Sequence, residues 1–214
     1  MNAREERFNA ATHGFGLVLG CVGAVVVIAA AARNGTPWQV LACSAYAVTL
    51  VAAYAASTMS HFVTGAAARR AFRIADQAII FLFIAGSYAP IAATWLRGGH
   101  WWVLHAAVFG VAAFGFMSKA AFAHRVEVGS VSAGLYLLLG WSPLFAARPL
   151  VAAMPEGLSL WLMVGGICYT VGLIFFSYDH RVRYFHAAWH VMVIAGSACH
   201  YFGILFYCTG SPRP

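Results

Sequence analysis

The chain has 214 residues, of which 62% are hydrophobic and only 9% are charged, and its mean hydropathy is +0.78. This composition excludes a soluble domain and is typical of an integral membrane protein. The formal net charge of +7 does not indicate nucleic-acid binding, because the basic residues lie almost entirely in short gaps between apolar segments.

Apolar segments recur along the whole chain, each close to the ~20 residues that cross a bilayer as a helix. A cleaved signal peptide is the competing interpretation of the first segment, which however exceeds the roughly 7–15 apolar residues of such a peptide. The segments are 14–32, 38–63, 74–96, 101–122, 129–146, 159–178 and 187–207, and the fifth is the shortest. They predict an all-α, multi-pass protein with seven transmembrane helices in a single domain, residues 1–214.

The basic residues are divided unequally between the two sides of the membrane. Lys and Arg in short loops are retained on the cytoplasmic side, so the side with more of them is cytoplasmic. One side carries Arg4, Arg7, Arg69, Arg70, Arg73, Lys119, Arg125, Arg181 and Arg183, and the other carries Arg33, Arg97, Arg148 and Arg213. We therefore expect a cytoplasmic N-terminus and an external C-terminus.

With this topology, polar side chains from three helices arrive at the cytoplasmic end of the bundle. The second segment ends with Ser57 and His61, the third begins with Asp76, and the seventh begins with His186 and His190. Histidines at positions i and i+4 share one helix face and can hold one metal ion. Ionisable groups inside a membrane are costly and are functional by default. The convergence predicts a metal site.

Three neutral imidazoles with one open position form a common catalytic zinc arrangement. Asp76 is expected to complete the site, directly or through water, or to act as general base, and Ser57 to orient a ligand or donate to an oxyanion. A structural interpretation remains for each residue alone: His61 as an interfacial side chain, and Asp76 as the partner of Arg73. Imidazole also suits copper, iron and nickel.

Two further histidines can be compared with the predicted metal site by their depth in the membrane. His13 lies at the cytoplasmic end of the first segment, where we expect it to contact a metal ligand or carry protons rather than bind the metal. His200 lies about 21 Å beyond His186 along a helix and cannot share that ion. We expect His200 to be a hydrogen-bonded packing residue.

Four motifs follow one another along the chain: Glu6-x-x-Asn9-x-x-Thr12-His13 before the first span, Ser57-x-x-x-His61, Asp76, and His186-x-x-x-His190. In this order they resemble the hemolysin III family, the bacterial branch of the progestin and adipoQ receptor family. The resemblance covers nearly the whole chain.

The resemblance implies a seven-helix protein of the bacterial inner membrane with an intramembrane zinc ion near the cytoplasmic face. It implies that His61, His186 and His190 coordinate zinc, that Asp76 contacts it directly or through water, and that Glu6, Asn9 and His13 surround the ligands. Related receptors resemble ceramidase-type lipid hydrolases, and bacterial members are linked to membrane-lipid homeostasis. Membrane lipids are thus the expected partners. The chain lacks the large soluble N-terminal region of the receptors, so we expect no protein hormone.

Three functions follow from these residues. The leading hypothesis is a zinc-dependent hydrolase of a lipid amide or ester, with Asp76 as proton acceptor and Ser57 positioning water or oxyanion. The second is a pore-forming hemolysin, against which the nearly uniform apolar character of the span centres argues. The third is a sensor of lipids or membrane state, in which His61, His186, His190 and Asp76 close a structural zinc site.

Overall fold

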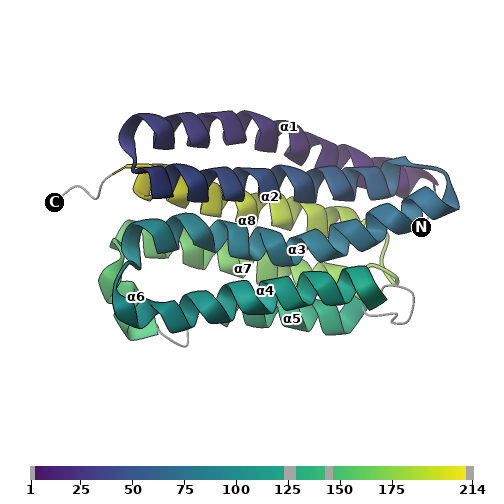
Figure 1. Cartoon of the computed structure of the whole chain (residues 1–214). Helices are drawn as coiled ribbons and strands as arrows, with labels where there is room; N and C mark the ends of the chain where they lie inside the picture. Colours follow the sequence, from purple (N-terminus) through teal and green to yellow (C-terminus); the bar gives the residue numbers. More distant parts are fainter. Residues whose placement is uncertain (1–2, 123–128, 143–146, 211–214) are drawn as a thin grey trace.

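The computed structural model describes residues 3–122, 129–142 and 147–210, and this part of the chain is helical without a strand. Figure 1 shows long helices lying side by side in one bundle, with the short helix α6 at one end. The helices are α1 (Ala3–Asn34), α2 (Pro37–Phe62), α3 (Ala66–Trp95), α4 (Trp102–Phe122), α5 (Gly129–Trp141), α6 (Ala147–Ala153), α7 (Glu156–Tyr178) and α8 (Phe185–Tyr207), and a 3₁₀ turn at Gly99–Trp101 precedes α4. The all-α prediction is confirmed.

Six helices in the described residues are long and apolar enough to cross a membrane: α1, α2, α3, α4, α7 and α8. Helix α5 lies in the expected fifth segment but has 13 residues, and residues 143–146 of that segment lie outside the described ranges. The protein is therefore a multi-pass membrane protein. The count of seven spans, the orientation in the membrane and the single domain stay predictions.

Two helices begin well before their apolar segments. Helix α1 starts at Ala3 rather than near residue 14, and α3 starts at Ala66 rather than near residue 74. Arg69 and Arg73, expected in a gap, are therefore helical. The added turns are polar, and their helical periodicity turns one face toward the bundle, where Asn9 is 1% exposed. Hydropathy locates the lipid-crossing part of a helix and misses such polar extensions.

The first two helices form a tight antiparallel hairpin. The Thr36 hydroxyl accepts a hydrogen bond from the Gln39 backbone N–H, and the Gln39 side chain accepts one from the Thr36 backbone N–H at 2.8 Å. This capping box, with Pro37 in the first turn, starts α2 immediately after α1 ends. A side chain at Gly35 would place its Cβ 2.7 Å from the Ala31 carbonyl oxygen, so the hairpin requires glycine there.

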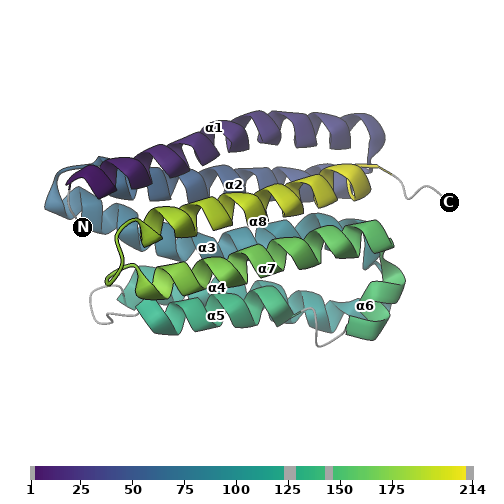
Figure 2. The same cartoon turned by 180° about the vertical axis from the view of Figure 1, so that it is seen from behind.

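Helices α7 and α8 pack closely because small residues face large ones across their contact. A Cβ on Gly172 would lie 2.9 Å from the Trp189 ring, and one on Gly196 would lie 2.8 Å from the Tyr169 ring. Small residues are what allow membrane helices to approach one another. Figure 2 shows α8 running between α1 and α7. This packing brings the end of α7 beside the start of α8.

The bundle is apolar both inside and outside. Large side chains such as Tyr46, Phe81 and Leu96 are at most 1% exposed, whereas Phe15 and Val25 on α1 are 61% and 70% exposed. Exposed apolar side chains over whole helix faces are expected where lipid replaces water. Polar side chains that are buried in this bundle therefore stand out, and most of them gather at its two ends.

Candidate metal centre

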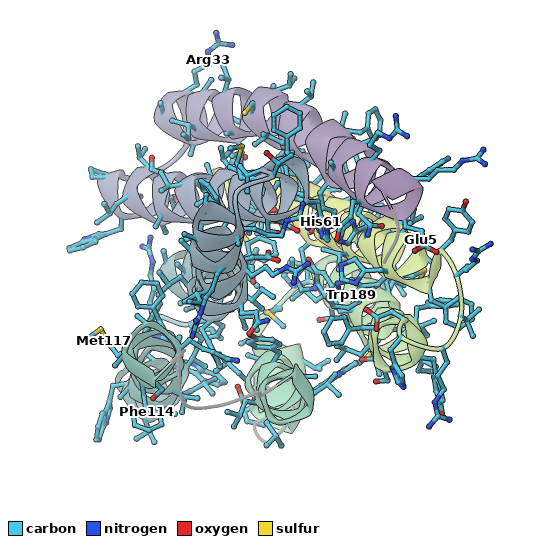
Figure 3. The ribbon with its side chains drawn as sticks, turned by 90° about the vertical axis from the view of Figure 1, so that its right-hand side faces the viewer. Glu5, Arg33, His61, Phe114, Met117 and Trp189 are labelled. Atoms are coloured by element: carbon cyan, nitrogen blue, oxygen red, sulfur yellow. The ribbon has the colours of Figure 1, made fainter. Side chains whose placement is uncertain are left out.

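Three histidines from two helices meet at the end of the bundle where α1 and α8 begin. One potential ligand atom from each of His61, His186 and His190 lies within 4.8 Å of the others. His61 is in the last turn of α2, and the other two are in the first two turns of α8. Figure 3 views the bundle from this end, with His61 toward its middle and Phe114 and Met117 on its outside.

Each of these imidazoles has an oxygen partner at Nδ1. The three contacts are His61 to Glu6 Oε2 at 2.7 Å, His186 to Asp179 Oδ2 at 2.7 Å, and His190 to Thr12 Oγ1 at 2.9 Å. A carboxylate can only accept, so Nδ1 of His61 and His186 donates. The Thr12 hydroxyl donates its proton to the Asn9 carbonyl oxygen at 2.9 Å, so its oxygen can accept a hydrogen bond from His190 Nδ1.

These contacts decide which nitrogen is left for a ligand. With Nδ1 donating, Nε2 carries the lone pair in all three rings. An oxygen partner on the distal nitrogen is the arrangement that orients metal-bound histidines and raises their basicity. One nitrogen from each ring lies within 4.8 Å of the others, and three such donors fit a tetrahedral metal ion with one position open to another ligand.

The polar extension of α1 covers this cluster. Besides His61, Glu6 pairs with Arg73 at 3.5 Å and lies 3.9 Å from Arg69, so it links α1, α2 and α3. Glu5 lies 4.0 Å from Arg183 in the α7–α8 loop. Of the α1 residues expected around the ligands, Glu6 therefore contacts a histidine directly, and Asn9 acts through Thr12.

Ser57, Asp76 and His13 lie beside the histidine cluster. Ser57 hydrogen-bonds to the Asp76 carboxyl group, and its Oγ lies 2.7 Å from His13 Nδ1. The His13 ring stacks on His190 with centroids 3.5 Å apart, and its buried Nε2 has no hydrogen-bond partner among the described residues. Asp76 is not in the set of atoms within 4.8 Å of one another in the described chain, and Arg73 forms its ion pair with Glu6 instead.

Asp179 was not predicted as a site residue from the sequence, and Thr12 had no predicted role of its own. Asp179 follows the last residue of α7 and lies seven residues before His186. Its position at the end of an apolar segment near His186 was visible in the sequence, but their contact depends on how the chain reverses between α7 and α8. His200 lies apart from the cluster, with Nε2 3.3 Å from the Leu162 carbonyl oxygen.

A cavity of about 520 Å³ opens from the cluster into the bundle. His13, His61, Asp76, His186 and His190 line one end, and apolar residues from α2, α3, α5, α7 and α8 line most of the rest. On α3 the lining runs from Arg73 to Ile91, which is about 27 Å along a helix. A mostly apolar cavity with a few polar groups at one end is the usual form of a small-molecule site.

Comparison with known proteins gives one family. The model of the family described as "Haemolysin-III related" matches residues 1–201. A Hemolysin-3 homolog of Bacillus subtilis is 35% identical over 210 residues, covering 98% of this chain and 97% of the relative. Hemolysin-3 of Bacillus cereus is 36% identical over 205 residues, covering 95% and 92%. The human monocyte to macrophage differentiation factor is 28% identical over 222 residues, covering 97% and 86%.

Proposed function

The chain belongs to the haemolysin-III-related family, and from that premise we propose that it is a zinc-dependent hydrolase of a lipid amide or ester. It is a multi-pass bacterial membrane protein, because six helices in the described ranges are long and apolar enough to cross a membrane and its relatives include bacterial proteins. The observation that carries the proposal is the position of three histidine nitrogens, within 4.8 Å of one another, at the mouth of an apolar cavity. The inner membrane and a role in lipid homeostasis belong to the same proposal.

Zinc is the metal that suits this donor set best. His61, His186 and His190 would hold it through Nε2, and three imidazoles with a nearby carboxylate match common catalytic zinc sites. Bound there, zinc would supply a Lewis acid for the carbonyl group of the substrate. The three nitrogens leave a position open, which favours a catalytic ion over a structural ion closed by four protein ligands.

The remaining polar residues prepare the proton transfer. The Asp76 carboxylate accepts the proton of the attacking water, as a general base must lie within reach of that water. Ser57 donates a hydrogen bond to that carboxyl group and thereby holds it beside the histidines. His13, stacked on His190 and paired with Ser57 at 2.7 Å, fixes the position of both side chains.

The size and apolar lining of the cavity support a lipid as the substrate. Its volume of about 520 Å³ lies within the roughly 300–1,000 Å³ of small-molecule sites. Its walls are predominantly apolar, with Leu137, Leu150 and Leu162 among the lining residues. An acyl chain would occupy the apolar part while its amide or ester group lies at the histidines. The expected partners are therefore membrane lipids.

The proposal is tested by lipid cleavage with purified, detergent-solubilised protein. Ceramides and other acyl amides and esters would be incubated with the wild type and with His190→Ala, and released fatty acid would be measured. We expect cleavage by the wild type and at least a 100-fold loss in the variant, since metal-ligand loss removes the Lewis acid. Undiminished cleavage by a folded His190→Ala protein would refute the metal-dependent mechanism.

The names of the bacterial relatives favour one second candidate, a cytolytic pore. Two of them are named Hemolysin-3 or its homolog. A pore needs polar side chains along its pathway, whereas the cavity beyond the histidine cluster is mostly apolar. Single-channel conductance of purified protein in planar bilayers at low protein-to-lipid ratio would establish this second function, and a silent bilayer would exclude it.

A further inference from the structure

Three hydroxyl groups meet in the wall of the cavity, away from the histidines. Tyr54 donates a hydrogen bond to Ser197 Oγ at 2.9 Å, and Tyr169 Oη lies 3.0 Å from the same Ser197 oxygen. Tyr54 is 4% exposed and Ser197 is 5% exposed. Both tyrosines line the cavity. We refer to Tyr54, Ser197 and Tyr169 as the hydroxyl cluster.

The hydroxyl cluster has one proton more than it has hydrogen bonds. Among the described residues it contains three O–H groups and two hydrogen bonds, both of them within the cluster. Tyr54 spends its proton on Ser197. In the second hydrogen bond either Ser197 or Tyr169 is the donor. Whichever of the two does not donate keeps an O–H without an acceptor in the cluster. A buried hydroxyl without a partner destabilises the folded protein.

The direction of the bonds places the free proton at the cavity. If Tyr169 donated, Ser197 would receive two hydrogen bonds, and its own proton would be confined in a site that is 5% exposed. If Ser197 donates, the bonds run from Tyr54 to Ser197 to Tyr169, and each bond polarises the next. The free O–H then belongs to Tyr169, whose side chain is less buried and lines the cavity.

A fourth hydroxyl in the same region also lacks an acceptor. Tyr46 is completely buried, and its Oη has no hydrogen-bond partner among the described residues. Its electrostatic neighbours include Tyr169 and Tyr54. Two hydroxyl protons in this part of the bundle therefore have no acceptor among the described residues, although nearly all buried polar groups in proteins are paired.

Two helices independently give the same distance from the hydroxyl cluster to the histidines. On α2, Tyr54 lies seven residues before His61, and on α8, Ser197 lies seven residues after His190. Seven helical residues span about 10 Å. The cluster and the histidines therefore face the same cavity at two depths about 10 Å apart.

We propose that Tyr169 donates its free proton to an oxygen atom on the chain of the lipid substrate. The inference rests on the proposed function and adds a substrate class: a lipid chain that carries a hydroxyl or carbonyl oxygen in its middle. An extended hydrocarbon advances about 1.3 Å per carbon, so this oxygen lies about eight carbons from the group held at the histidines. Unsubstituted chains leave the donor unpaired and bind more weakly.

Binding of free fatty acids tests the inference without turnover. Hexadecanoic acid, its isomer hydroxylated about eight carbons from the carboxyl group and its isomer hydroxylated beside the carboxyl group would be titrated calorimetrically into the solubilised full-length protein. We expect the mid-chain hydroxy acid to bind about five- to tenfold more tightly than the other two, because it gains one buried hydrogen bond. In Tyr169→Phe this preference should disappear.

A matched control is Tyr201→Phe, which also removes one tyrosine hydroxyl near the cluster. The Tyr201 hydroxyl donates to the Gly23 carbonyl oxygen at 3.1 Å and does not line the cavity, so the preference should remain. Because the acids are not turned over, this binding measurement separates chain recognition from the proposed hydrolysis. Equal affinities for the three acids, no binding of any acid, or a preference that survives Tyr169→Phe would each overturn the inference.

Discussion

Both ends of the bundle bury polar side chains, but these side chains are satisfied in different ways. At the glutamine end, formed by Thr36, Gln39, Thr94 and Cys208, the Gln39 amide donates to Thr94 Oγ1 at 3.1 Å and to the Gly210 carbonyl oxygen at 2.8 Å. Its oxygen accepts from the Thr36 backbone and hydroxyl. Both polar atoms of the Gln39 side chain are therefore hydrogen-bonded within the protein.

At the histidine end, formed by His13, His61, Asp76, His186 and His190, the outward Nδ1 atoms are paired and the inward nitrogens are not. His61, His186 and His190 each pair Nδ1 with an oxygen 2.7–2.9 Å away, which leaves Nε2 of each ring for another partner. His13 Nε2 is buried without a partner among the described residues. Burial of polar groups is common to both ends. Ring nitrogens without a hydrogen-bond partner distinguish a ligand-binding site from a polar contact that only holds helices together.

Among substitutions at the two ends, His61→Ala is expected to have the largest effect, a loss of zinc affinity. Structural zinc sites bind with about 10–16 kcal/mol, or about 2.5–4 kcal/mol for each of four ligands, so the loss of one ligand is expected to weaken binding by about 70- to 900-fold. Competition with a chelator would measure the loss. His105→Ala is the matched control: His105 bonds to Tyr88 and to the Leu96 carbonyl oxygen, so its loss should leave zinc affinity unchanged. Equal affinity losses in both variants would contradict the assignment.

Gln39→Leu should break the glutamine end without touching the metal. The substitution removes the partners of Thr94, Gly210 and the Thr36 backbone, and we expect about 2–3 kcal/mol of lost stability. Denaturant unfolding of the solubilised protein would show the loss, while zinc content should stay at the wild-type value. Loss of zinc from the folded Gln39→Leu protein would show that the two ends are not independent.

Asp179→Ala should weaken zinc binding by about 10- to 100-fold, because His186 loses the acceptor that orients it. Asp179→Asn keeps an acceptor without the charge and should recover part of the affinity. If Asn and Ala lower zinc affinity equally, the carboxylate charge rather than the hydrogen bond controls His186.

Thr12→Val should have the smallest effect, about three- to tenfold in zinc affinity, since only a neutral hydroxyl partner of His190 is lost. Thr12→Ser retains the hydroxyl and should bind zinc as the wild type does. Chelator competition with the three proteins side by side would resolve the difference. Weaker binding by the serine variant would mean that the methyl group of Thr12, rather than its hydroxyl, supports His190.

Much of this architecture follows from local patterns in the sequence. Apolar segments of membrane-crossing length predict the helices, and the spacing of His186 and His190 places both on one face. The topology also predicts that His61 reaches the same depth. The structure brings these three side chains together, although metal binding itself stays a prediction.

The remaining features depend on contacts that periodicity does not encode. Helix α1 continues through polar residues because Glu6 and Thr12 find partners on α2 and α8. The Asp179 contact depends on the reversal between α7 and α8. Likewise, depth alone places Asp76 with the histidines, whereas the side-chain directions keep it outside the set of atoms within 4.8 Å.

The central claim is tested most directly by the zinc content of the purified, detergent-solubilised protein, measured by elemental analysis beside a His186→Ala, His190→Ala double variant. We predict about one zinc ion per wild-type chain and none in the folded variant, because two of three ligands are removed. A folded wild type without bound metal, or equal zinc in both proteins, would contradict the metal centre and the hydrolase mechanism with it.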